Sequence, residues 1–205
     1  VVPDPEVFFN DVVLLKNGGF VASHMFDKRS PHVLGLSTGV FKAMLGMDTG
    51  YVLAWQRDSG FRILEESHGA FINGVELSAN ERHVFANVYF GKELRKLDLQ
   101  TGKKVGSAAI AKADNLAWDK QGYLLNIAHT GTLQTQLACM KQPGQTCALG
   151  YTVYRINPDT MASEILFVHE GSPMGAATVA RQLDDWLYLG SYTGNRIVRM
   201  LYPTH

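Results

Sequence analysis

A unit of two short apolar strands joined by a polar turn recurs four times along the chain, and this repetition limits the fold more than any other feature. Runs of β-branched and aromatic residues separated by Asn- and Gly-rich turns are typical of β-hairpins. The four repeats share this layout and begin at Asn10, Asn73, Asp114 and Gly175. The sequence therefore predicts a chain built of successive antiparallel sheets.

Further strand-like segments follow the hairpins. Third strands fit residues 51–56, 93–99, 151–156 and 195–200, and fourth strands fit residues 61–65, 104–109 and 163–168. The last repeat has too few residues after Met200 for a fourth strand. Four-stranded antiparallel units in series are typical of a β-propeller, in which each unit is one blade. We therefore predict an all-β fold, with four blades of a β-propeller in a single domain over residues 1–205 and further blades preceding Val1.

Two repeats carry insertions at the same topological position. Residues 27–50 and 129–150 directly follow the second strands of the first and third repeats. Insertions at one position of a blade lie on one face of a propeller, and that face usually carries the functional site. Residues 38–47 are apolar enough for a short helix, which would either cap the core or act as a lid over a substrate.

The balance of charge excludes some classes of partner. Nineteen Lys and Arg residues balance nineteen Asp and Glu residues, which gives a formal net charge of zero at pH 7. A surface that binds nucleic acid or an anionic membrane needs an excess of basic residues. No apolar run reaches transmembrane length. We therefore expect no nucleic-acid partner and no transmembrane segment, while the oligomeric state is left open.

The two cysteines, Cys139 and Cys147, lie close together in the sequence. They lack neighbouring Cys or His residues that would complete a zinc site. Either they form a disulfide that closes a short loop through a turn at residues 143–144, or they are the two thiols of a cytosolic protein. A disulfide would favour a secreted or periplasmic protein, because such bonds persist in oxidising compartments.

Polar side chains stand at the start of three repeats, namely Asn10, Asn73, and Asp114 with Asn115. The first strand of each blade lines the central channel of a propeller, so residues at its start converge on the axis. Carboxylate and amide oxygens in such an arrangement suit a hard cation such as Ca²⁺, and another divalent cation would also fit. The alternative is that these side chains only bond neighbouring backbone groups in turns.

Three segments around these residues carry a resemblance to a known family. Residues 7–13, 70–78 and 113–118 resemble, in their order and spacing, segments of the paraoxonase/arylesterase family. The wider resemblance is to the senescence-marker-protein/gluconolactonase superfamily and, more distantly, to strictosidine synthase. It extends from about Phe8 to Arg199, and the ordered combination of segments carries it rather than any single motif.

The resemblance implies a six-bladed ring with Ca²⁺ in its channel, which hydrolyses lactones or esters. In gluconolactonase-like members the position of Asn10 contacts substrate, and we extend this expectation to the adjacent Asp11. A further Glu ligand and the paraoxonase catalytic His would precede Val1. The resemblance assigns metal binding to four residues of this chain, which are Asn10, Asn73, Asp114 and Asn115.

Two histidines end second strands and are candidate catalytic bases. His24 aligns with a paraoxonase active-site His, although Ser23 stands where that family has Asp. His129 holds the analogous place in the third repeat. An imidazole at either position is suited to accept a proton near neutral pH. The alternative is that each is an ordinary polar residue at the mouth of a loop.

Together these features predict a calcium-dependent hydrolase of small-molecule lactones or carboxylic esters. The metal would polarise the substrate carbonyl, and a water molecule activated by a base would attack it. One alternative is a non-catalytic propeller that binds a ligand or a protein and uses calcium structurally. Another is a metal-free enzyme similar to strictosidine synthase. The identity of the substrate depends on loop conformations that the sequence leaves open.

Overall fold

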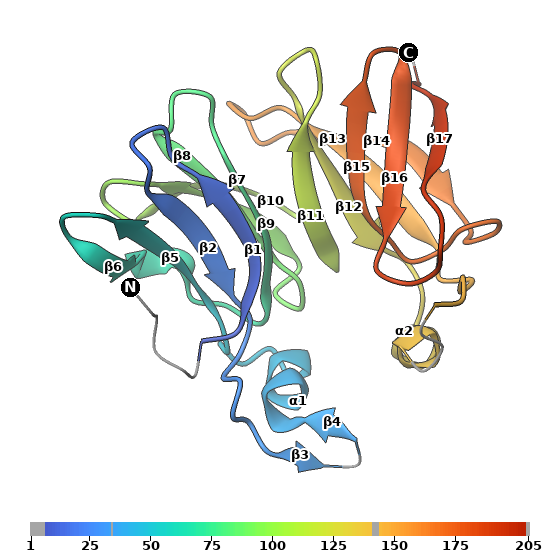
Figure 1. Cartoon of the computed structure of the whole chain (residues 1–205), viewed down its shortest axis with the longest axis horizontal. Coiled ribbons are helices and arrows are strands. Elements are labelled where there is room, and N and C mark those ends of the chain that lie inside the picture. The colour runs from blue at the N-terminus through green and yellow to red at the C-terminus, as the bar shows by residue number, and fades with distance from the viewer. Residues whose placement is uncertain (1–6, 34, 141–143, 204–205) are drawn as a thin grey trace. The chain divides into compact units, whose positions relative to one another are not determined.

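The computed structural model describes residues 7–33, 35–140 and 144–203 (Figure 1). The chain divides into two compact units, Val1–Ala113 and Asp114–His205. The predicted turn at residues 143–144 lies partly outside the described residues, since Pro143 is among those not described. No helix of the described segments is long and apolar enough to cross a membrane.

The first unit contains two blades, each an antiparallel sheet of four strands. The first blade has the order β1-β2-β5-β6, with bounds β1 (Phe9–Leu14), β2 (Phe20–His24), β5 (Tyr51–Gln56) and β6 (Gly60–Ile63). The second blade has the order β10-β9-β8-β7, with bounds β7 (Ile72–Leu77), β8 (His83–Val88), β9 (Glu93–Asp98) and β10 (Lys104–Ala108). A short 3-10 helix, η1 (Glu65–Ser67), connects the two blades.

The second unit contains a four-stranded and a three-stranded blade. The third blade has the order β11-β12-β13-β14, with bounds β11 (Ala113–Trp118), β12 (Leu124–His129), β13 (Tyr151–Ile156) and β14 (Ser163–His169). The fourth has the order β15-β16-β17, with bounds β15 (Ala177–Leu183), β16 (Trp186–Ser191) and β17 (Val198–Leu201). The all-β fold of four β-propeller blades is therefore confirmed, and the last blade has three strands among the described residues.

Both insertions follow second strands, as predicted. The first holds β3 (His32–Val33), β4 (Leu36–Ser37) and the helix α1 (Thr38–Met44), which confirms the helix expected within residues 38–47. Ser37 caps α1, because its hydroxyl accepts a hydrogen bond from the backbone N–H of Gly39. The second insertion holds a helix that the sequence analysis did not predict, α2 (Leu133–Met140).

Apolar residues at alternate strand positions form the core of each unit, because alternate side chains point to the same face of a sheet. In the first unit, Val21 and Val52 of the first blade belong to one buried cluster with Val75 and Val84 of the second. In the second unit, a separate cluster joins the facing sides of the third and fourth blades. Its buried strand residues include Leu125, Ile127, Val153, Leu187 and Leu189.

The first strands of three blades share an irregularity near their starts. The pairing of β1 with β2 shifts between Phe9 and Val12, and that of β7 with β8 shifts between Ile72 and Val75. A similar shift lies between Ala177 and Val179 of β15. A β-bulge of this kind adds one residue to a strand and redirects its side chains, and bulges are common beside active sites.

Candidate functional site

The bulges of β1 and β7 place polar residues of two neighbouring blades side by side. Asn10 and Asp11 lie in the first bulge, and Asn73 lies in the second. Asp11 Oδ2 accepts a hydrogen bond of 2.9 Å from the backbone N–H of Val75. Because this bond joins the two bulges directly, the strand starts that the sequence singled out in the first and second repeats are neighbours.

Asn73 has an unusual environment. Its side chain is 4% exposed, and Oδ1 is buried with no hydrogen-bond partner among the described residues. Leaving a buried acceptor unpaired costs about 1–3 kcal/mol, so such an atom calls for an explanation. One explanation is that Oδ1 of Asn73 is a ligand for a cation, because Ca²⁺ takes amide oxygens as ligands. Asn73 therefore fits the role that the sequence predicted for it.

Asn10 and Asp11 differ from Asn73. Asn10 is exposed, and its Nδ2 lies 3.1 Å from the sulfur of Met25. Asp11 is half-buried, and besides its bond to Val75 its Oδ1 accepts from the backbone N–H of Val12 at 2.8 Å. Burial raises the pKa of the Asp11 carboxyl, against the effect of these two hydrogen bonds. The carboxylate thus links two blades, and its predicted contact with substrate stays a prediction.

His24 ends β2 beside the first bulge. It pairs with Phe9 across the sheet, and the hydroxyl of the preceding Ser23 accepts a hydrogen bond from the N–H of Asp11. The side chain is 5% exposed, and its Nδ1 accepts a hydrogen bond of 2.9 Å from the backbone N–H of Phe8. Its ring lies 4.5 Å from that of Tyr51. Burial lowers the pKa of His24, which favours the neutral imidazole.

The second unit brings together the other predicted residues. Asp114 and Asn115 lie near the start of β11, and Asn115 Nδ2 donates a hydrogen bond of 3.0 Å to Asp114 Oδ1. The buried His129 ends β12, with its Nε2 3.8 Å from Asp114 Oδ2 and 3.0 Å from the carbonyl oxygen of Ala177. Because a carbonyl only accepts hydrogen bonds, Nε2 of His129 carries a proton. Asp114, Asn115 and His129 therefore form one polar cluster.

A tyrosine that the sequence analysis did not select lies at this cluster. The ring of Tyr192 stands edge-on to that of His129, at 6.0 Å between centroids. Burial raises the pKa of the Tyr192 hydroxyl, and the charge of Asp114 raises it further. No local pattern of the sequence links the segment around Tyr192 to β11 or β12.

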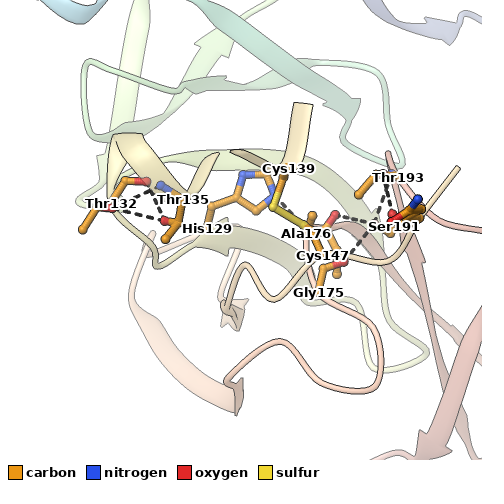
Figure 2. Close-up of a disulfide and its surroundings, with 11 residues drawn as sticks. His129, Thr132, Thr135, Cys139, Cys147, Gly175, Ala176, Ser191 and Thr193 are labelled. Carbon is orange, nitrogen blue, oxygen red and sulfur yellow. Dashed lines mark hydrogen bonds between the residues drawn. A yellow bond between two sulfur atoms is a disulfide. The ribbon is translucent and has the colours of Figure 1, made fainter. Parts of the chain in front are cut away.

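The second insertion is fixed beside this cluster by a disulfide. Cys139 and Cys147 are bonded, so the disulfide alternative of the sequence analysis is the one observed. Figure 2 shows the bond with the nearby Ser191 and Thr193. The Thr193 hydroxyl donates to the carbonyl of Gln145 at 2.8 Å, and Ser191 Oγ donates to the carbonyls at positions 175 and 176. The first bond ties the inserted loop to the turn after β16, and the bonds of Ser191 hold the residues just before β15.

The backbone of the inserted loop packs closely against Gly175. A Cβ atom at Gly175 would meet the carbonyl oxygen of Cys147 at 2.2 Å, so only glycine allows this approach of the two backbones. The next residue, Ala176, donates its N–H to the carbonyl of Leu149 at 2.8 Å. Gly175 thus lies against the loop and Ala176 bonds to it, whereas β15 begins at Ala177 and not at Gly175 as predicted from the sequence.

The predicted metal ligands fall into two groups, with Asn10 and Asn73 in the first unit and Asp114 and Asn115 in the second. That all four bind one cation stays a prediction. The described residues contain no group of three or more His, Cys, Asp and Glu side chains that could hold a metal ion. A cation here would therefore depend on amide oxygens such as Asn73 Oδ1.

The sequence matches no family model and no curated protein. The structure is similar to a luciferin-regenerating enzyme (14% identity, TM-score 0.55), a Bacteroides caccae protein of unknown function (9%, 0.58) and a Xanthomonas campestris gluconolactonase (14%, 0.54). The matches cover 91%, 99% and 95% of this chain, but 54%, 66% and 57% of those chains. At these identities the similarity establishes the fold alone. The predicted resemblance to gluconolactonase-type β-propellers is confirmed at that level.

Proposed function

We propose that the protein is a hydrolase of lactones or carboxylic esters that depends on a divalent cation, with Ca²⁺ as the preferred ion. The observation that carries the proposal is the buried Oδ1 of Asn73, which has no partner among the described residues and lies in a bulge beside Asn10 and Asp11. The fold supports the choice of reaction, since one of the similar solved structures is that of a gluconolactonase.

Within the first unit, Asn10 and Asn73 would hold the cation, and metal binding by Asp114 and Asn115 of the second unit stays a prediction. When bound, the cation supplies Lewis-acid chemistry, which polarises a carbonyl and stabilises negative charge on its oxygen. Asn73 is already desolvated and loses no protein hydrogen bond from Oδ1 on binding. Asn10 is exposed at the bulge of β1, and its amide would contact substrate as well.

His129 is the better placed of the two candidate bases. The Asp114 carboxylate lies 3.8 Å from Nε2, and a nearby negative charge stabilises the imidazolium that forms when the ring accepts a proton. The bond between Nε2 and the carbonyl of Ala177 fixes the orientation of the ring. His129 would therefore take a proton from water at Nδ1, because Nε2 carries the proton donated to Ala177, and its ring would stay in place.

A panel of aliphatic and aromatic lactones and esters, assayed with calcium and after chelation, tests the proposal. We expect calcium-dependent hydrolysis that is lost in Asn73→Ala and largely kept in Asn73→Asp, which retains an oxygen ligand. The matched control is Asn80→Ala, because Asn80 lies in an exposed turn of the same blade. Calorimetric titration with CaCl₂ gives a readout independent of turnover. Hydrolysis that survives both chelation and Asn73→Ala would contradict the proposal.

One observation favours a second candidate, a non-catalytic binding propeller with structural calcium. Asp11 uses both carboxylate oxygens to hold backbone groups of two blades together. The polar residues at the strand starts would then stabilise the packing of the blades and would take no part in catalysis. Calcium binding and calcium-dependent stability without hydrolysis of any substrate in the panel would identify this alternative.

A further inference from the structure

The hydrogen bond between Phe8 and His24 determines which nitrogen of His24 carries the proton. The backbone N–H of Phe8 can only donate, and it points at His24 Nδ1 over 2.9 Å. Nδ1 must therefore present a lone pair. A neutral imidazole has one N–H, so the proton of neutral His24 is on Nε2.

The surrounding structure holds this arrangement in place. The N–H of Met25, the residue after His24, donates to the carbonyl of Phe8 at 3.1 Å, so both backbone groups of Phe8 are engaged at the end of β2. The ring of Tyr51 lies 4.5 Å away. Rotating the His24 ring would break the bond to Phe8 inside a buried site. Burial also lowers the pKa of His24, so the ring is neutral at neutral pH.

The opposite nitrogen has different surroundings. Among the described residues, Nε2 of His24 has no hydrogen-bond partner, and it is not one of the fully enclosed unpaired atoms. His24 pairs with Phe9, which flanks the bulge that holds Asn10 and Asp11. An N–H without a protein partner is therefore available next to the residues proposed to bind the cation and the substrate.

We infer that His24 donates a hydrogen bond from Nε2–H to an oxygen of the lactone or ester substrate and does not act as a general base. A base must offer a lone pair to the water that it activates, and the lone pair of His24 is used by Phe8. A preorganised N–H donor instead stabilises the negative charge that develops on a carbonyl oxygen. The inference rests on the proposed hydrolysis and changes the role predicted for His24 from the sequence.

Three substitutions distinguish the two roles. His24→Gln carries an amide N–H near the position of Nε2 but has no basic nitrogen, whereas His24→Asn places its amide near Nδ1, and His24→Ala removes both. For a donor, we expect kcat/KM of His24→Gln to stay within about tenfold of wild type, and His24→Asn and His24→Ala to lose about 100- to 1000-fold. The acid limb of the pH profile of kcat/KM should persist in His24→Gln.

The inference is overturned if His24→Gln loses as much activity as His24→Ala and the acid limb disappears. Circular dichroism and thermal unfolding of each variant separate this result from misfolding. A second measurement uses the wild-type protein with ¹⁵N-labelled histidine. Nuclear magnetic resonance should show the proton of neutral His24 on Nε2, and a proton on Nδ1 would overturn the inference without any assay. A wild-type protein that hydrolyses no lactone or ester would instead overturn the proposed function.

Discussion

The carboxylate of Asp11 accepts a hydrogen bond from the backbone N–H of Val75, and this bond ties the first strand of one blade to the first strand of the next. The two residues are far apart in the sequence and meet because each lies at a β-bulge. The same bulges present Asn10 and Asn73. The residues that organise the candidate site therefore also hold together the two blades of the first unit.

Replacing Asp11 tests this link. Asp11→Ala leaves the N–H groups of Val75 and Val12 without their acceptor, so we expect the free energy of unfolding to fall by about 1–3 kcal/mol. Asp11→Asn keeps one acceptor oxygen and should lose less. Urea denaturation at neutral pH measures both changes. Equal stability of Asp11→Ala and wild type would show that the bond contributes nothing to blade association.

Calcium should stabilise the folded protein through Asn73. A ligand at 100 times its dissociation constant adds about 2.7 kcal/mol to the free energy of unfolding if it binds only the folded state. We expect the melting temperature of wild type to rise with CaCl₂ and that of Asn73→Ala to stay constant. Differential scanning calorimetry across a calcium series measures the effect, and MgCl₂ at equal ionic strength is the control. A parallel rise in both proteins would place the bound ion elsewhere.

The strands of this fold could be predicted from the sequence because their signals are local. Glu93–Asp98 and Tyr151–Ile156 are bounded by turn residues, and both were predicted to within one residue. The bond of Asp11 to Val75 depends on the register of two separate hairpins, which no local pattern specifies. The position of Tyr192 beside His129 likewise depends on how the last hairpin folds back. Local patterns therefore predicted the blades, whereas contacts between blades required the structure.

Candidate residues were also easier to predict than their roles. Asn73 was selected for its place at a strand start, and the structure adds that its oxygen is buried without a partner among the described residues. His24 was selected for its place at the end of a second strand. Its hydrogen bond to Phe8 argues against the role of base, and that bond is invisible in the sequence because it depends on ring orientation.

Stability should depend on pH through His24. Burial depresses its pKa below the ordinary value of 6.5, so the unfolded chain binds the proton more tightly than the folded protein does. The contribution of neutral His24 is therefore present above that value and is lost as the pH falls below it. Urea denaturation from pH 8 to pH 5 should show a steeper loss in wild type than in His24→Gln. Identical pH profiles would mean that His24 titrates normally in the folded state.

The disulfide should stabilise the second unit. A disulfide that joins two residues with a sequence separation of 8 lowers the conformational entropy of the unfolded chain. In the chain-entropy model this raises the free energy of unfolding by about 2.5 kcal/mol. We expect a loss near this size in Cys139→Ser/Cys147→Ser, measured by urea denaturation, and a similar loss in wild type with reductant. The double variant itself should be unaffected by reductant. Unchanged stability on reduction would show that the contacts of Thr193 and Ala176 hold the loop without the bond.

Removing the buried carboxylate of Asp119 should strongly destabilise the second unit. The carboxylate of Asp119 is fully buried and accepts hydrogen bonds from Arg155 Nε at 3.0 Å and from the hydroxyl of Tyr202 at 2.9 Å. Asp119→Ala leaves the guanidinium without its buried partner, and breaking such a pair costs about 3–5 kcal/mol. Tyr202→Phe removes one hydrogen bond and should cost about 1.5–3 kcal/mol, because the bond is to a charged group.

The matched control for this prediction is Glu164→Ala. Glu164 also contacts Arg155, at 3.4 Å, but its side chain is 56% exposed, and an exposed pair contributes about 0–1 kcal/mol. Urea denaturation of the variants should therefore rank Asp119→Ala as the most destabilised, then Tyr202→Phe, then Glu164→Ala. A loss in Glu164→Ala as large as that in Asp119→Ala would mean that the surface pair, and not the buried carboxylate, anchors Arg155.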